Sequence, residues 1–203
     1  MALPLFGMMR GTRIACGVWQ SARFVHNAIV MKTDRPLRRG LTPAAALFAL
    51  ALAGPVLATE AGEAAPPFAL PTAKGETVAL DKLRGKVVYV DFWASWCGPC
   101  RRSFPWMNEM QQKYGAKGFV VVGVNVDKKR ADADKFLAQN PAGFTVVYDE
   151  AGATPSAYAV KGMPSSYLID ARGNVTFVER GFLDGSKAVL EQKIAALVAA
   201  AKN

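Results

Sequence analysis

One segment of the 203-residue sequence limits the possible folds more than any other. It begins with a near-continuous apolar run over residues 87–93 (VVYVDFW), which predicts a central β-strand that is covered on both faces. Cys97 and Cys100 follow within a few positions, and a helical pattern then continues to Tyr114 before Gly115 ends it. The two cysteines therefore lie where a buried strand passes into a helix.

Strand and helix patterns alternate along the chain after residue 67. A second apolar run over residues 119–126 (FVVVGVNV) predicts another buried strand. Because a strand, a helix and a strand in this order imply a right-handed parallel crossover, the fold class is α/β with a parallel or mixed sheet. The other expected elements are a short hairpin of residues 68–70 and 77–80, a helix over 129–140, a strand over 145–148, a short helix over 154–160, a hairpin of 166–169 and 175–180, and an amphipathic helix from a Ser186 cap to about Ala201.

The amino-terminal part of the chain has the pattern of an export signal. From Met31, four basic residues precede an apolar stretch over residues 41–57, and the small residues that end at Ala58 suit signal peptidase. Cleavage after Ala58 and retention as an anchor in the inner membrane are both open, and either one places the rest of the chain in the periplasm or an equivalent exported location. Residues 1–30 are explained by an over-long start assignment, with an organelle presequence as the alternative.

The formal net charge of +9 is distributed unevenly. Residues 1–58 hold seven Lys or Arg and one acid, whereas residues 59–203 hold eighteen and fifteen, so the body carries only +3. This balance does not indicate a nucleic-acid partner. The small, proline-rich residues 59–67 (TEAGEAAPP) predict a flexible linker between the leader, residues 1–58, and one folded domain over residues 68–203.

The position of the Cys-x-x-Cys pair determines its expected chemistry. At a helix start, the first sulfur lies beside unpaired backbone N–H groups, and the helix dipole favours the thiolate. Such motifs lower a cysteine pKa from about 8.5 to between roughly 3.5 and 7.5. Cys97 is therefore expected to attack a disulfide and Cys100, one turn on, to resolve the mixed disulfide. Pro99 suits the first turn, where its missing N–H costs no hydrogen bond.

A Cys-x-x-Cys pair can also be half of a zinc site or a purely structural bridge. Zinc needs four ligands, but Cys16 and His26 lie upstream in the leader and the body has no other cysteine or histidine. A bridge that closes so small a loop constrains the unfolded chain little. The pair is therefore predicted to be a redox centre, with no metal and no cofactor.

Two motifs resemble the thioredoxin family. The segment over residues 90–101 (VDFWASWCGPCR) looks like the thioredoxin active site, and Pro105 corresponds to the proline that kinks its helix. Gly162-Met163-Pro164 resembles the family's cis-proline loop. The body is most similar to the exported TlpA-like and ResA-like thioredoxins. This resemblance implies a thioredoxin-like fold, with a central mixed sheet flanked by helices, an amino-terminal hairpin and a central strand-helix insertion.

The resemblance also implies roles for individual residues. Asp91 matches the buried aspartate that is thought to move the proton of the second cysteine, and a partly hydrated carboxylate is the alternative. Ser103 departs from the family, which often has an acid three residues after the second cysteine. Trp93 is expected in the core, and Trp96 and Cys97 are expected to face the solvent. The expected substrate contacts are Trp96, Gly98, Pro99, Met163 and Pro164.

The same family acts on exported proteins, including apocytochromes and copper-site proteins. A disulfide-bearing exported protein is therefore the expected partner of a monomer. The Gly98-Pro99 dipeptide is that of thioredoxin, a strong reductant, which favours a reductase over an oxidase. In an oxidising compartment, a reductase needs a membrane-embedded electron donor. Sequence leaves open the direction of electron flow, the partner and the donor.

Two other functions are compatible with parts of the sequence. A peroxidase of the peroxiredoxin type has a related fold, but that family uses one peroxidatic cysteine with a threonine a turn before it, whereas Ala94 and Ser95 precede Trp96 here. A Cu(I)-binding module would use the thiolates of Cys97 and Cys100, with Met163 as a further soft ligand. The same Met163 suits a packing role equally well.

Overall fold

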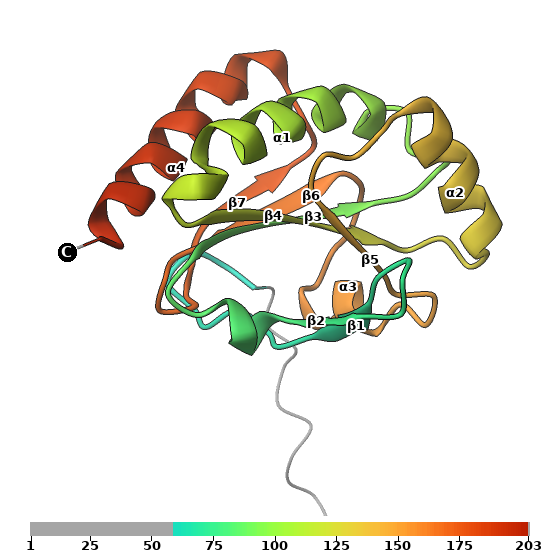
Figure 1. The fold of residues 1–203 in the computed structure, drawn as a ribbon, viewed down its shortest axis with the longest axis horizontal. Helices are drawn as coiled ribbons and strands as arrows, with labels where there is room; N and C mark the ends of the chain where they lie inside the picture. The colour runs from blue at the N-terminus through green and yellow to red at the C-terminus, as the bar shows by residue number, and fades with distance from the viewer. Residues whose placement is uncertain (1–58, 203) are drawn as a thin grey trace, which may run out of the picture. The chain divides into compact units, whose positions relative to one another are not determined.

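The computed structural model describes residues 59–202, and the predicted leader, residues 1–58, lies outside them (Figure 1). Its centre is a five-stranded sheet with the strand order β5-β4-β3-β6-β7. The strands of this sheet are β3 (Val87–Trp93), β4 (Phe119–Asn125), β5 (Thr145–Tyr148), β6 (Ser165–Ile169) and β7 (Val175–Arg180). Among residues 59–202, no helix combines the length and the apolar character needed to cross a membrane.

The sheet is mixed, as predicted. Strands β3, β4 and β5 run parallel to one another, β6 runs antiparallel to β3, and β7 runs antiparallel to β6. Strands β3, β4, β5 and β7 therefore all end at one edge of the sheet, which we call the carboxyl edge, and β6 begins there. The loops that follow these four strands, and the loop that precedes β6, therefore all lie at the carboxyl edge.

Two layers cover the two faces of the sheet (Figure 1). The helices on one face are α1 (Cys100–Tyr114), α2 (Arg130–Gln139) and α4 (Lys187–Ala200). The other face carries the hairpin of β1 (Ala69–Pro71) and β2 (Thr77–Ala79), and the short helix α3 (Ala153–Ala157). Three 3-10 helices complete the fold: η1 (Leu80–Leu83), η2 (Gly115–Lys117) and η3 (Asp184–Ser186).

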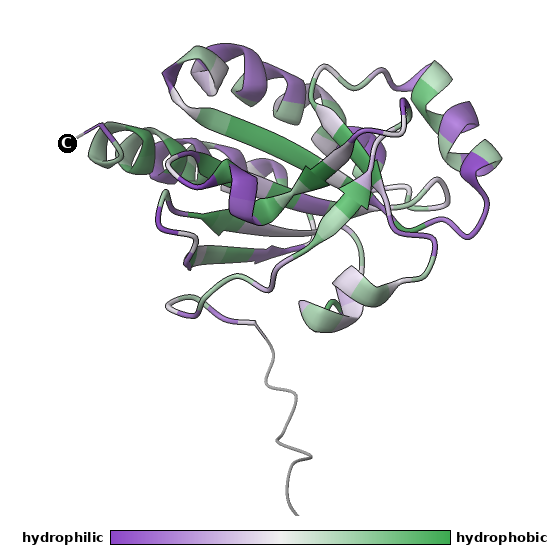
Figure 2. Ribbon diagram, turned by 60° about the horizontal axis from the view of Figure 1, so that its bottom comes forward, coloured by the Kyte–Doolittle hydropathy of each residue, from purple (hydrophilic) through white to green (hydrophobic). Residues whose placement is uncertain are grey.

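The alternation of side chains along β3 divides the core between these layers. Tyr89 and Trp93 pack on the face of α1, whereas Val90 and Phe92 pack on the face of the hairpin. Every residue of β3 is buried, which is why its sequence is nearly continuously apolar, and Figure 2 shows hydrophobic stretches along the strands of the sheet. The predicted thioredoxin-like α/β fold is confirmed, with its amino-terminal hairpin and its insertion of α2, β5 and α3.

The segment over residues 59–67 differs from the expected flexible linker. The amide of Gly62 donates to the carbonyl of Val175 at 2.8 Å, and the amide of Val175 donates back to Glu63 at 2.8 Å. The Arg180 guanidinium pairs with Glu60 at 2.7 Å. Small and proline-rich residues do not prevent backbone pairing with the exposed side of an edge strand, so composition alone gave the wrong expectation here.

Helix α4 begins where predicted but is not capped as predicted. The hydroxyl of Ser186 donates to the carbonyl of Leu183 at 2.8 Å and accepts no amide of the helix. The preceding 3-10 turn η3 places Ser186 in a helical backbone conformation, whereas a side-chain cap needs an extended one.

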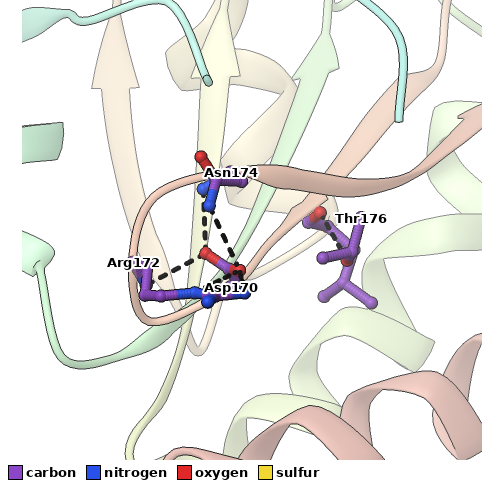
Figure 3. A network of polar contacts seen from close by, with 5 residues as sticks. Asp170, Arg172, Asn174 and Thr176 are labelled. Atoms are coloured by element: carbon purple, nitrogen blue, oxygen red, sulfur yellow. Dashed lines mark hydrogen bonds and ion pairs between the residues drawn. The ribbon is translucent and has the colours of Figure 1, made fainter. Parts of the chain in front are cut away.

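A carboxylate organises the turn between β6 and β7, at the edge opposite the carboxyl edge (Figure 3). Asp170 accepts hydrogen bonds from the amides of Arg172 at 2.9 Å and Asn174 at 2.8 Å. Partial burial raises the pKa of Asp170, but these hydrogen bonds outweigh it and hold the pKa below its ordinary value. The Asp170 carboxylate therefore stabilises the hairpin while it is ionised.

Candidate active site

The two cysteines of the motif form a disulfide at the amino-terminal end of α1. Their Cα atoms are 5.4 Å apart, and Cys100 is the first residue of the helix, after Pro99 at the cap position. The amide of Cys100 donates to the Sγ atom of Cys97 at 3.3 Å. A backbone donor aimed at this sulfur, at the positive end of a helix, stabilises negative charge on it. Cys97 is thus the sulfur best placed to leave and to attack as a thiolate.

The exposed surface at this disulfide comes from its neighbours rather than from the sulfurs. Trp96 is 71 % exposed, whereas Cys97 is 4 % exposed and Cys100 is fully buried. Gly98 and Pro99 are exposed. The expectation that Cys97 faces the solvent is therefore wrong for this oxidised form. Trp93 lies in the core and Trp96 at the surface, as expected.

A carboxylate that the sequence did not single out holds the turn in front of Cys97. Asp127, 4 % exposed, accepts hydrogen bonds from the amide of Ser95 at 2.9 Å and from its hydroxyl at 3.0 Å. The amide side chain of Asn125 donates to the same carboxylate at 2.8 Å. The turn itself closes through the amide of Cys97, which donates to Ala94 at 3.0 Å. Asp127 thereby fixes the loop after β3 to the end of β4.

Asp91 lies in the middle of β3 and is 1 % exposed, which rules out the partly hydrated alternative. The hydroxyl of Ser166, its register partner on β6, donates to Oδ1 of Asp91 at 2.6 Å. Burial raises the pKa of Asp91 to about 7, against a smaller lowering by the Ser166 hydrogen bond. Because Asp91 alternates with Val90 and Phe92, its side chain lies on the face covered by α1, the face that also holds Cys100.

The loop that resembles the cis-proline loop lies at the carboxyl edge, directly before β6. The peptide bond between Met163 and Pro164 is cis. The carbonyl of Pro164 accepts a hydrogen bond from the amide of Gly181 at 2.8 Å, which joins this loop to the end of β7. Met163 is partly buried against the core, and Leu183, two residues after Gly181, is 67 % exposed. The exposed position of Leu183 at this edge was not visible in the sequence, because only the strand order brings the loop after β7 to the edge that holds the cysteines.

These residues together support a two-electron exchange of sulfur bonds. The site combines a helix-start sulfur with a backbone donor, a second sulfur bonded to it, and a buried carboxyl group with a pKa of about 7. Within residues 59–202, no group of three or more His, Cys, Asp or Glu is arranged to hold a metal ion.

The fold and the disulfide at the start of α1 define a thioredoxin-like thiol-disulfide oxidoreductase. Residues 60–194 match the Redoxin family, and the chain belongs to that family. The sequence is 36 % identical over 124 residues to the thiol-disulfide oxidoreductase ResA of Geobacillus kaustophilus. The aligned segment covers 61 % of this chain and 71 % of the relative. It is 33 % identical over 125 residues to ResA of Bacillus subtilis, covering 62 % and 70 % of the two chains.

Solved structures agree with these relatives. A crystal structure from Chlorobium tepidum, assigned as a thiol:disulfide interchange protein DsbE, has a TM-score of 0.67 and 57 % sequence identity. It covers 70 % of this chain and 99 % of its own chain. A second structure from the same organism, a thiol:disulfide interchange protein of the thioredoxin family, has a TM-score of 0.59 and 28 % identity, and covers 67 % and 96 % of the two chains. The resemblance to TlpA-like and ResA-like proteins is therefore confirmed.

Proposed function

We propose that this protein reduces disulfides in exported partner proteins, of the kind matured into cytochromes or copper-site proteins. The observation that carries the proposal is the hydrogen bond from the amide of Cys100 to the Sγ atom of Cys97, next to the exposed Trp96. A donor on this sulfur stabilises the thiolate of the reduced form, and the thiolate rather than the thiol is the nucleophile in disulfide exchange.

The proposed reaction begins with the reduced protein, in which both cysteines are thiols. The Cys97 thiolate attacks one sulfur of the partner disulfide, a new bond forms between the two proteins, and the partner's other sulfur leaves as a thiolate and takes a proton. Cys100 then loses its proton and attacks Cys97, and the second partner sulfur leaves as a thiolate that is protonated in turn. Two electrons pass to the partner, whose disulfide becomes a dithiol, and the pair of Cys97 and Cys100 is oxidised.

Asp91 is proposed to accept the proton of Cys100 in the second step. Its carboxyl group, with a pKa of about 7, is partly ionised near neutral pH and can both take and return a proton. The Oδ2 atom has no hydrogen-bond partner among the described residues, so it is free to act as the acceptor. Trp96, Gly98, Pro99, Met163 and Pro164 are proposed to contact the partner chain around the bond that breaks.

The direction and the location of the reaction belong to the same proposal. The predicted signal over residues 31–58 supports action in the periplasm, either after cleavage or from an inner-membrane anchor over residues 41–57. In that compartment, a reductase must be re-reduced by a donor of electrons from the cytoplasmic side, which we propose to be a membrane-embedded dithiol protein. The Gly98-Pro99 dipeptide supports reduction rather than oxidation.

Trapping of the mixed disulfide tests the proposal. In cells that export the full chain, Cys100→Ser should accumulate a covalent complex through Cys97, and mass spectrometry of that complex identifies the partner. The matched variant Cys97→Ser should accumulate none. Alkylation of living cells should find the wild-type pair mostly reduced at steady state. A fully oxidised pair would assign the protein to disulfide formation, and equal trapping by both variants would exclude ordered exchange.

A further inference from the structure

A hollow of about 230 Å³ lies beside the redox turn, between the first turn of α1 and helix α2. Its walls are formed by Ser95, Arg101, Asp132, Lys135, Phe136 and Gln139. Ser95 stands two residues before Cys97, and Arg101 directly follows Cys100. The hollow therefore lies beside the segment that holds the disulfide, on the side of the α2 helix, whereas the loop of Pro164 precedes β6, on the other side of β3 in the sheet.

The charged groups of this hollow leave a positive surplus. Arg101 and Lys135 are exposed, and neither forms an ion pair with any of residues 59–202. Asp132 is the only acid in the wall, so two cations face one carboxylate. The positive end of α1 adds to the same field, since Arg101 lies in its first turn.

The base of the hollow is apolar. Phe136 is 4 % exposed, and the Arg101 guanidinium lies 5.9 Å from the centre of its ring. Stacking on an aromatic ring orients the guanidinium, and a planar guanidinium with free donors matches the two oxygens of a carboxylate. The carboxylate of an acidic side chain fits such a site, because its two oxygens can pair with the guanidinium of Arg101 and the ammonium of Lys135.

We propose that this hollow binds an aspartate or glutamate side chain of the partner protein, close in sequence to the cysteine that Cys97 attacks. This inference rests on the proposed reductase function and adds a preference for disulfides in acidic sequence surroundings. The bound carboxylate would hold the partner disulfide over Cys97 from the side of α2.

Two peptides test this preference with the reduced full chain. Both contain the same intramolecular disulfide, and they differ only in a Glu or a Gln next to one cysteine. The second-order rate constant for reduction should be about threefold higher for the Glu peptide at low salt, the size expected of an exposed ion pair. The ratio should approach one at 1 M salt, where the screening length is only about 3 Å.

Substitutions in the hollow test whether it is the site that favours the Glu peptide over the Gln peptide. In Arg101→Gln and Lys135→Gln, the ratio of the two rate constants should fall toward one, and the ratio cancels any change in the reactivity of Cys97 itself. The matched control Lys82→Gln removes an exposed charge in η1, away from the hollow, and should keep the ratio.

Equal rates for the two peptides at low salt would overturn the inference and leave the reductase function standing. A ratio kept by both variants would also overturn it, and reduction of neither peptide would overturn both proposals.

Discussion

The hydroxyl of Ser166 donates a hydrogen bond of 2.6 Å to the Oδ1 atom of Asp91 across the pairing of β6 with β3. Both residues are 1 % exposed, and the other carboxyl oxygen of Asp91 has no partner among residues 59–202. Burial disfavours the ionised carboxylate, and the hydroxyl partly restores it. The balance of these two effects places the pKa of Asp91 at about 7, so the carboxyl group is partly ionised near neutral pH.

Replacement of this carboxyl group should slow the reaction. Asp91→Asn is expected to reduce a disulfide substrate at least about tenfold more slowly near pH 7, because an amide cannot accept the proton of Cys100. Between pH 6 and pH 8, the wild-type rate should rise as Asp91 ionises, and the variant should lose this rise. Stopped-flow kinetics measure both effects, with the exposed Asp81→Asn as the control. Identical pH profiles of Asp91→Asn and wild type would remove Asp91 from the mechanism.

The hydroxyl of Ser166 should tune that pH profile. Ser166→Ala removes the donor that lowers the pKa of Asp91, so the rise of the rate should move to higher pH. Ser166→Thr keeps a hydroxyl and should stay near the wild-type profile. A residue with only a packing role would change stability without moving the profile, so an unmoved midpoint in Ser166→Ala would contradict this positioning role.

Asp91 should also make the folded state less stable as pH rises. Its pKa is about 7 in the folded state and has an ordinary value of 3.8, so the folded chain binds this proton more tightly. The buried carboxyl group therefore does not lower the free energy of unfolding at low pH. Its destabilising effect grows between about pH 4 and pH 7 and is constant above pH 7. At 1.36 kcal/mol for each pKa unit, Asp91→Asn should be more stable than wild type at pH 8 by at most about 4 kcal/mol. Urea unfolding at pH 4 and pH 8 measures this difference, which should vanish at pH 4.

The carboxylate of Asp127 should be needed for a firm redox turn. Asp127→Asn replaces one acceptor oxygen with a donor that faces the amide of Ser95, so the free energy of unfolding should fall by about 1–3 kcal/mol. Ser95→Ala loses only one hydrogen bond and should cost about 1 kcal/mol. Asp127→Asn should loosen the turn more than Ser95→Ala does. Alkylation of reduced Cys97 at fixed pH should therefore slow more in Asp127→Asn than in Ser95→Ala. Equal stability of both variants and wild type would show that these bonds do not hold the turn.

The turn between β6 and β7 should lose stability in acid. The lowered pKa of Asp170 means that its carboxylate stabilises the folded state above its unfolded pKa, and that this contribution disappears as pH falls through the folded pKa. Asp170→Ala should therefore lower the free energy of unfolding by about 1–2 kcal/mol at pH 7. The difference from wild type should shrink below about pH 4. A difference that stays constant down to pH 2 would assign the effect to packing instead.

Residues with strong local patterns were predictable from the sequence. The run over residues 87–93 gave the bounds of β3, because burial on both faces requires apolar side chains at nearly every position. Asp91 stood out for the same reason, as an acid inside that run. The position of Cys97 at a helix start was equally visible, since Pro99 and the helical pattern follow it directly.

Contacts between distant segments were not predictable in the same way. Asp127 is 32 residues from Ser95, and Ser166 is 75 residues from Asp91, so only the strand order brings each pair together. Residues 59–67 showed neither periodicity nor apolar runs, and their backbone pairing with β7 leaves no mark on their composition. The cations of the hollow were visible as charges, but their arrangement around Phe136 depends on how α2 packs.

The pairing of Glu60 with Arg180 has a practical consequence for handling this protein. Arg180 ends β7 at the carboxyl edge, so the chain enters the domain on the side from which a partner must approach Cys97. Helix α4 finishes beside the turn of Asp170 and Arg172, at the opposite edge. A purification tag or a surface linkage attached behind α4 therefore lies at the edge of the sheet away from the cysteines, whereas one joined before Glu60 lies at the same edge as the cysteines.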